Sequence, residues 1–157
     1  MKRADRITMP ILFIGHGSPL NAVEDNAFSK AWLDMGRRLP RPSTVLCISA
    51  HWQTQGSRVT AMDRPSTLYD FFGFPDKLYT VRYPCNGAPD LARRLQDLLP
   101  AGTVQPDFTW GLDHGAWSVL CRLFPAAETP VAQLSLDLNK SPRQHYQLGT
   151  ALKHLRQ

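Results

Sequence analysis

Two histidines occupy similar places in the chain, each shortly after a brief apolar run. His16 follows the run at residues 11–14, and His51 follows the run at residues 45–49. Both runs are free of charged residues and rich in branched aliphatic side chains, which is typical of strands buried on both faces of a parallel sheet. Because ligands bind beyond the carboxyl ends of such strands, we expect the two imidazoles to converge on one catalytic metal ion.

The residues beside these histidines suit a metal site. Gly15 and Gly17 flank His16 and permit tight turning of the backbone. Ser18 and Ser49 are candidates for hydrogen bonds that would orient the imidazoles. The spacing matches no compact zinc motif, since the chain contains neither HxxxH nor CxxC. The alternative is that each histidine is a hydrogen-bonded structural residue.

A third histidine, His114, stands at the predicted start of a helix, where Asp113 is the expected N-cap. A histidine at this position could act as a general acid–base group or hold a substrate oxygen. The alternative is a capping or core histidine. The other two histidines, His145 and His154, lie in the last predicted helix among polar neighbours, and we expect them to face solvent.

Two other chemistries receive little support. The segment 15–19 reads Gly-His-Gly-Ser-Pro after an apolar run, as some phosphate loops do, but it has no third glycine and no P-loop lysine. It also does not fit G-x-S-x-G, so the sequence gives only weak support to Ser18 as a nucleophile.

The elements that must position these residues alternate between strand and helix. Strands are expected at residues 11–14, 45–49, 58–62 and 131–136, and helices at 26–38, from Pro89, at 113–124 and from Ser141. In the first helix, Phe28, Trp32 and Met35 form the expected buried stripe. Residues 64–89 are rich in proline, glycine and aromatic side chains and predict a long, ordered loop. The pattern predicts one α/β domain over residues 1–157 with a largely parallel sheet.

The composition excludes several classes of protein. The formal charge is +5, but the basic residues are scattered, so we expect no nucleic-acid partner. No run of about 18 apolar residues predicts a membrane span. The basic N-terminus, residues 1–6, is not followed by a signal peptide pattern, and a cytoplasmic location is expected. The three cysteines form no CxxC, and Cys47 and Cys121 are expected to be buried small apolar residues.

Four motifs occur in order along the chain. They are Gly15-His16-Gly17-Ser18-Pro19, Ser49-Ala50-His51-Trp52, Asp70-Phe71-Phe72-Gly73-Phe74-Pro75 and Asp113-His114-Gly115-Ala116-Trp117. Together they resemble the class III extradiol ring-cleavage dioxygenases, in particular a bacterial and plant subgroup that acts on DOPA. The resemblance runs from about Met9 to the end of the chain.

This resemblance implies a three-layer α/β/α fold and a non-haem divalent metal, Fe(II) or Zn(II). It implies an aromatic diol substrate whose ring is opened by O2. His16 and His51 match the family's metal ligands, and His114 matches its catalytic histidine. The residues expected to contact substrate are Ser18, Trp52, Phe72, Tyr79 and Asp113.

Members of this family are considerably longer and carry further ligands, so we expect this chain to be the N-terminal part of a longer catalytic domain. Two alternatives to an active dioxygenase remain. One is a catalytically incomplete fragment with a residual metal half-site, which could associate with itself through a free sheet edge. The other is a metal-assisted hydrolase.

Overall fold

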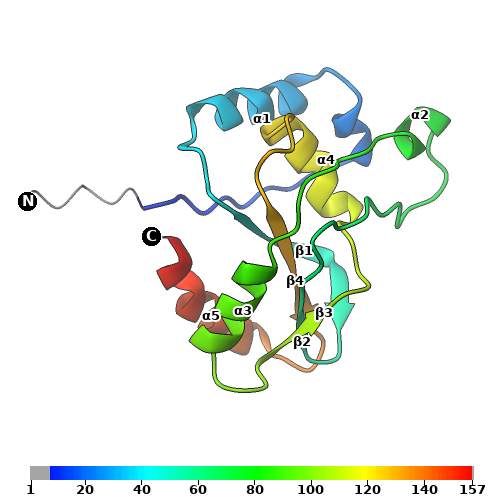
Figure 1. Ribbon diagram of the computed structural model, residues 1–157. Helices are drawn as coiled ribbons and strands as arrows, with labels where there is room; N and C mark the ends of the chain where they lie inside the picture. Colours follow the sequence, from blue (N-terminus) through cyan, green and yellow to red (C-terminus); the bar gives the residue numbers. More distant parts are fainter. Residues whose placement is uncertain (1–7, 157) are drawn as a thin grey trace, which may run out of the picture.

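A four-stranded sheet with helices on both faces forms the body of the protein, which a computed structural model describes for residues 8–156 (Figure 1). The basic residues 1–6 noted above lie outside this range. The strands are β1 (Val45–Thr54), β2 (Ser57–Thr60), β3 (Val104–Asp107) and β4 (Val131–Asp137). The helices are α1 (Ala27–Arg38), α2 (Asp76–Tyr79), α3 (Pro89–Leu98), α4 (His114–Leu123) and α5 (Pro142–Ala151), with 3-10 helices η1 (Pro19–Ala22) and η2 (Leu152–Arg156).

The strands lie in the order β1-β4-β2-β3. β1 runs parallel to β4 and β2 runs parallel to β3, whereas β2 meets β4 in the antiparallel sense at Val59 and Leu134. β4 has a neighbour on each side, and six of its seven residues are buried. The prediction of an α/β fold with a largely parallel sheet is therefore confirmed.

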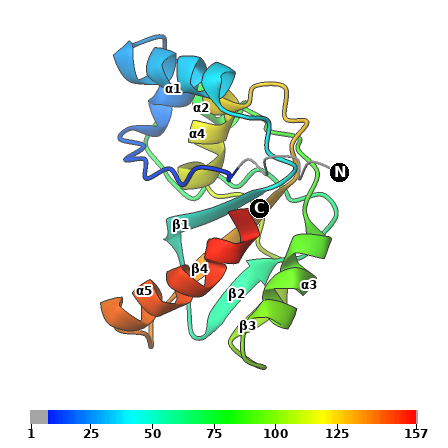
Figure 2. The same cartoon turned by 90° about the vertical axis from the view of Figure 1, so that its left-hand side faces the viewer.

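Helices cover the sheet in two layers. α3, α5 and η2 lie on one face, and α4 with α1 outside it lies on the other (Figure 2). Leu95 of α3 and Leu152 of η2 pack with Val59 and Leu134 of the sheet on the first face. Trp117 and Leu120 of α4 pack with the beginning of β4 on the second face. This arrangement is the three-layer α/β/α architecture that the family resemblance implies.

The predicted helix starts are confirmed by their capping contacts. Asn26 caps α1, Ser141 caps α5, and Asp113 caps α4 by accepting a hydrogen bond from the Ala116 N–H at 3.1 Å. The prediction of a buried stripe on the first helix is wrong in one residue, Phe28. Trp32 is buried, but Phe28 is 67% exposed because it lies on the outer side of α1, while its neighbour Ser29 and Trp32 are the residues that α1 buries.

The prediction of a first strand at residues 11–14 is also wrong. Residues 11–14 are extended but belong to no strand, and the side chains of Ile11 and Phe13 are 74% and 103% exposed. An apolar run becomes a buried strand only where a neighbouring strand takes up its backbone hydrogen bonds. Within residues 8–156 no strand pairs with this run, and β1 is an edge of the described sheet. His16 therefore follows an extended segment rather than a strand.

The strand boundaries differ from expectation in two further places. β1 continues to Thr54, so His51 lies inside it, at an irregularity where the pairing with β4 shifts between Ile48 and Gln53. As an edge strand it is less buried than predicted, and Ile48 is 51% exposed. The short edge strand β3 was not predicted. It contains Pro106, which cannot donate a backbone hydrogen bond and is tolerated at an edge.

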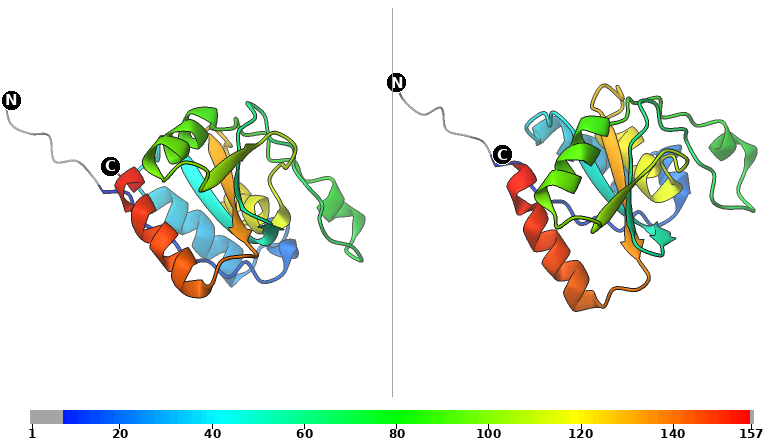
Figure 3. Two further views of the ribbon diagram at one scale, coloured as in Figure 1. Left: turned by 90° about the horizontal axis from the view of Figure 1, so that it is seen from below. Right: turned by 60° about the horizontal axis from the view of Figure 1, so that its bottom comes forward.

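The predicted long loop is present over residues 64–88, up to the start of α3; it includes the single turn of α2 and projects to one side of the sheet (Figure 3). Aromatic side chains order it. Tyr83 is 2% exposed, and Tyr69 donates a hydrogen bond from its hydroxyl to the Val81 carbonyl at 2.5 Å. In the described part of the chain, no helix has both the length and the apolar character needed to cross a membrane.

Candidate metal centre

Three histidines from three separate parts of the chain meet at one point. His16 comes from the segment before η1, His51 from β1, and His114 from the first turn of α4. One ring nitrogen from each lies within 4.8 Å of the other two. The Nε2 atoms of His16 and His51 are 2.8 Å apart, and the ring centroids of His51 and His114 are 4.0 Å apart. This spacing allows one ion to contact all three imidazoles.

The close approach of β1 and α4 at this point requires a residue without a side chain. A Cβ atom on Gly115 would lie 2.6 Å from Cδ2 of His51 and 2.7 Å from Oγ of Ser49. Both distances are well inside van der Waals contact. Gly115 therefore lets the start of α4 lie against the strand that carries His51.

A buried carboxylate underlies the contact between β1 and α4. Asp113 is fully buried, and its Oδ1 accepts hydrogen bonds from the Ser49 hydroxyl at 2.8 Å and from the Ala116 N–H. Its Oδ2 accepts a hydrogen bond from the Gln133 amide of β4. Ser49 in turn accepts a hydrogen bond from the His51 N–H at 3.2 Å. These hydrogen bonds compensate the burial of the polar side chain and fix the backbone beside His51 and His114.

The long loop contributes a second carboxylate to the centre. Oδ1 of Asp70 accepts a hydrogen bond from the His114 N–H at 2.9 Å and lies 3.0 Å from Nδ1 of the same histidine. Burial alone would raise the pKa of Asp70, but the contacts with His114 outweigh it and the pKa is lowered. With Nδ1 turned toward Asp70, Nε2 is the nitrogen of His114 that remains for other partners.

His16 is adapted to stay neutral. Burial lowers the pKa of its imidazole, and the neighbouring His114 and His51 lower it further. Its Nδ1 is buried and has no hydrogen-bond partner among the described residues. A neutral imidazole is the form that binds a metal. The chemistry of the three donors therefore fits a divalent ion of the kind that prefers imidazole, such as Zn(II) or Fe(II).

The other titratable candidates lie outside this group. His154 is exposed, as predicted. The prediction that His145 faces solvent is wrong, because His145 is half-buried and contacts the Asp137 carbonyl at 3.1 Å. Burial raises the pKa of the Cys47 thiol to about 12 and that of the Cys121 thiol to about 11, so both are protonated at neutral pH.

The residues predicted to contact substrate differ in their burial and in what they contact. Ser18 is exposed and caps η1, and Asp113 lies buried beneath the histidines. The side chain of Trp52 is 3% exposed and stacks on Trp110 with a centroid distance of 5.5 Å, because alternation along β1 turns it away from the face of His51. Phe72 is 92% exposed. No aromatic contact of Trp52 or Phe72 with the three histidines is found among the described residues, and their expected contact with substrate stays a prediction.

The aromatic contact with the histidines comes from the neighbour of Phe72. The ring of Phe71 meets His114 edge-on with a centroid distance of 5.5 Å. Tyr79 packs on Phe71 at 5.1 Å and so lies one residue further out. Phe71, Asp70 and Gly115 belong to the motifs quoted above, but nothing in the motifs tells which of their members face the site. Only the path of the loop decides this.

An α/β/α layer fold with three converging imidazoles defines a class of non-haem metalloproteins. Within that class, the chain belongs to the family described as the catalytic LigB subunit of aromatic ring-opening dioxygenase, which matches residues 10–157.

Individual relatives agree with this membership. The chain is 47% identical over 149 residues to 4,5-DOPA dioxygenase extradiol of Escherichia coli K12, covering 94% of this chain and 55% of the relative. It is 43% identical over 150 residues to the protein of the same name from Beta vulgaris, covering 92% and 56%. A crystal structure of an uncharacterized protein from E. coli K12 superposes with a TM-score of 0.70 at 42% identity, covering 85% of this chain and 50% of the other. The chain thus spans about half the length of these relatives.

Proposed function

We propose that this chain supplies the histidine-bearing half of an extradiol dioxygenase centre, which opens the ring of a catechol with O2. The observation that carries the proposal is the convergence of His16, His51 and His114 within 4.8 Å. Membership of the ring-opening dioxygenase family and the names of the relatives support a catechol of the DOPA type as substrate.

In this proposal His16 and His51 hold the metal, and His114 is the catalytic acid–base group. A bound Fe(II) or Zn(II) would supply a Lewis-acid centre, and iron would add redox chemistry with O2. The lowered pKa of His16 keeps that imidazole available at neutral pH. Because the oxygen of Asp70 faces Nδ1 of His114, Nε2 is free to take a proton from a catechol hydroxyl and to return it later.

The aromatic loop serves as the wall of the substrate site. The edge-on ring of Phe71 against His114, backed by Tyr79, provides an apolar surface of the kind that receives a planar ring and excludes water. In this proposal Phe71 rather than Trp52 or Phe72 forms the surface, since Trp52 is buried against Trp110 and Phe72 is exposed.

The test is anaerobic loading with Fe(II), followed by addition of DOPA and air. We expect consumption of O2 and a yellow ring-opened product in the parent, and loss of both in His114→Ala. His154→Ala is the matched control, since it removes an exposed histidine outside the cluster. Product formation that is equal in the parent and in His114→Ala would exclude the proposed role of that residue.

A second candidate is a chain that binds the metal without turning over a catechol. The exposed apolar residues Ile11, Phe13 and Ile48 favour it, because exposed apolar groups often mark surfaces that pack against a partner. Metal binding without O2 consumption in the same experiment would support this reading. Ester hydrolysis with Zn(II) and no O2 consumption would favour a metal-assisted hydrolase.

A further inference from the structure

His16 is the one member of the histidine cluster that no helix or strand holds. His51 lies in β1 and His114 opens α4, whereas His16 lies in an extended segment just before η1. Gly17 follows it with φ near +61°, a conformation in which a side chain would be strained. The place of His16 must therefore be fixed by contacts of its own segment with the rest of the protein.

Asn21 makes the contact that reaches His16. Its side-chain Nδ2 donates a hydrogen bond to the His16 carbonyl at 2.9 Å. The other end of the amide, Oδ1, accepts a hydrogen bond from the side chain of Asn26 at 2.7 Å. Asn26 is itself fixed, because its own Oδ1 caps the first turn of α1. The Asn21 side chain is thus oriented at both ends, with its donor directed at His16.

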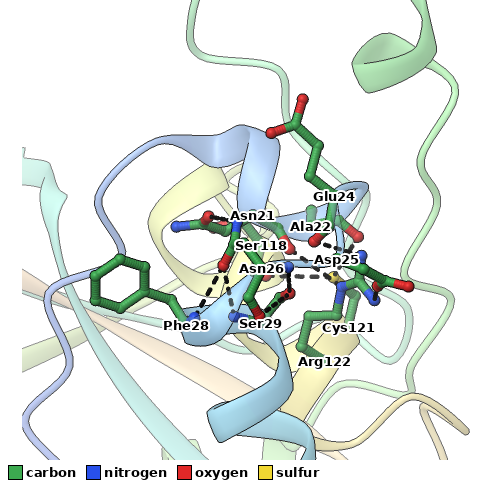
Figure 4. A network of polar contacts seen from close by, with 10 residues as sticks. All are labelled: Asn21, Ala22, Glu24, Asp25, Asn26, Phe28, Ser29, Ser118, Cys121 and Arg122. Carbon is green, nitrogen blue, oxygen red and sulfur yellow. Dashed lines mark hydrogen bonds and ion pairs between the residues drawn. The ribbon is translucent and has the colours of Figure 1, made fainter.

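Arg122 of α4 holds the backbone on which Asn21 sits (Figure 4). Its Nε donates to the Asn21 carbonyl at 3.1 Å, and one terminal nitrogen donates to the Glu24 carbonyl at 3.1 Å. The other terminal nitrogen donates to the Asp25 carboxylate at 2.9 Å. The Arg122 side chain is only 20% exposed, and its contact with the Asn21 carbonyl is half-buried, whereas the Asp25 carboxylate is 73% exposed. A planar guanidinium can make all three at once, which a lysine ammonium on a flexible stem cannot reproduce.

We propose that Asn21 and Arg122 are positioning residues for His16. Helix α4 then carries His114 at its first residue and, through Arg122 and Asn21, also sets the place of His16. The positions of His16 and His114 therefore both depend on α4. The third histidine, His51, lies in β1, against which α4 packs. The inference rests on the proposed metal centre, because the relative positions of the three imidazoles matter only if they act together.

Zinc affinity, measured by competition with a chromophoric chelator, tests the role of Asn21. We expect Asn21→Ala to weaken Zn(II) binding by about tenfold, the order seen when a group that orients a metal ligand is removed. Asn86→Ala is the matched control. It removes an exposed asparagine next to the opposite, amino end of β4, and its Zn(II) affinity should equal that of the parent.

A double-mutant cycle separates positioning from general damage to the fold. If Asn21 acts through His16, Asn21→Ala will cause no further loss of affinity in a His16→Ala background. An equal loss in both backgrounds would overturn the proposal. Urea unfolding of each variant shows whether the folded state persists. Arg122→Lys extends the test, and its effect on Zn(II) affinity should likewise vanish in the His16→Ala background.

The outcomes distinguish the inference from the function on which it rests. If the parent binds no more Zn(II) than the His16→Ala, His51→Ala double variant, the metal centre itself is refuted. If His16→Ala weakens binding strongly while Asn21→Ala and Arg122→Lys bind as the parent does, the metal centre stands and the positioning role is refuted.

Discussion

A single oxygen of Asp70 meets His114 twice, accepting a hydrogen bond from its backbone N–H at 2.9 Å and lying 3.0 Å from its Nδ1. The first contact satisfies one of the free N–H groups at the start of α4, and the second places a carboxylate oxygen beside the ring. The long aromatic loop is therefore tied to His114 by a carboxylate, and the loop and the helix should respond together when that carboxylate is removed.

Removing the Asp70 carboxylate should weaken both the fold and the chemistry. We expect Asp70→Ala to lower the free energy of unfolding by about 1 kcal/mol, since a negative charge at a helix N-terminus is lost. The kcat/KM for DOPA should fall about tenfold or more. Urea unfolding and O2 uptake measure the two effects. Asp63→Ala, an exposed aspartate earlier in the same region, should change stability by no more than about 0.5 kcal/mol.

Metal binding should depend on the pair of ligands. We expect the His16→Ala, His51→Ala double variant to retain almost no Fe(II) or Zn(II) after gel filtration, because His114 alone cannot hold a divalent ion. Atomic absorption gives the metal content directly. His145→Ala serves as the control, since its ring contacts the Asp137 carbonyl instead of the cluster. Equal metal content in the double variant and the parent would contradict the assignment of the ligands.

Two glycine substitutions in helices should have opposite effects. Gly115→Ala would bring a methyl group within 2.6 Å of the His51 ring, and we expect a loss of about 1–3 kcal/mol of stability with weaker Zn(II) binding. Gly149→Ala in α5 meets no atom within 4 Å and should stabilise the protein by about 0.5–1 kcal/mol through helix propensity. Chemical denaturation of the two variants compares them. A neutral Gly115→Ala would show that the strand and helix can separate without cost.

The neighbouring phenylalanines of the loop offer a test of which one faces the site. Phe71 packs against Phe74, Tyr79 and Trp117, so Phe71→Ala should lower the free energy of unfolding by about 2–3 kcal/mol. Phe72 is 92% exposed, and Phe72→Ala should stay within about 0.5 kcal/mol of the parent. In the loaded enzyme only Phe71→Ala should raise KM for DOPA. A raised KM in Phe72→Ala alone would restore the expectation drawn from the sequence.

The buried carboxylate of Asp137 should make stability depend on acid pH. Burial raises its pKa, but hydrogen bonds from Lys140 and from the N–H groups of Asn139 and Gly56 outweigh this and lower it. The folded pKa therefore lies below the unfolded value of about 3.9, so the stabilisation is present above about pH 4 and lost as the pH falls through the folded pKa. We expect Asp137→Asn to be less stable than the parent at pH 7. The difference in urea midpoint should shrink between about pH 4 and pH 2, and a constant difference would argue against the lowered pKa.

The sequence by itself determined the type of fold and the identity of the three histidines that converge. Local signals sufficed for the helices, because Asn26, Asp113 and Ser141 cap them through contacts within one turn. The quoted motifs marked His16, His51 and His114, since a metal site demands particular residue types, and residue types are visible in a sequence.

Only the tertiary structure decided how these residues are supported. The run at residues 11–14 has the composition of a buried strand but lies extended and exposed, because burial depends on a neighbouring strand and not on the run itself. The contacts of Asp70 with His114 and of Arg122 with Asn21 join residues 44 and 101 positions apart. A sequence does not reveal such pairs, because the geometry that joins them arises only when the loop, the extended segment and α4 have packed together.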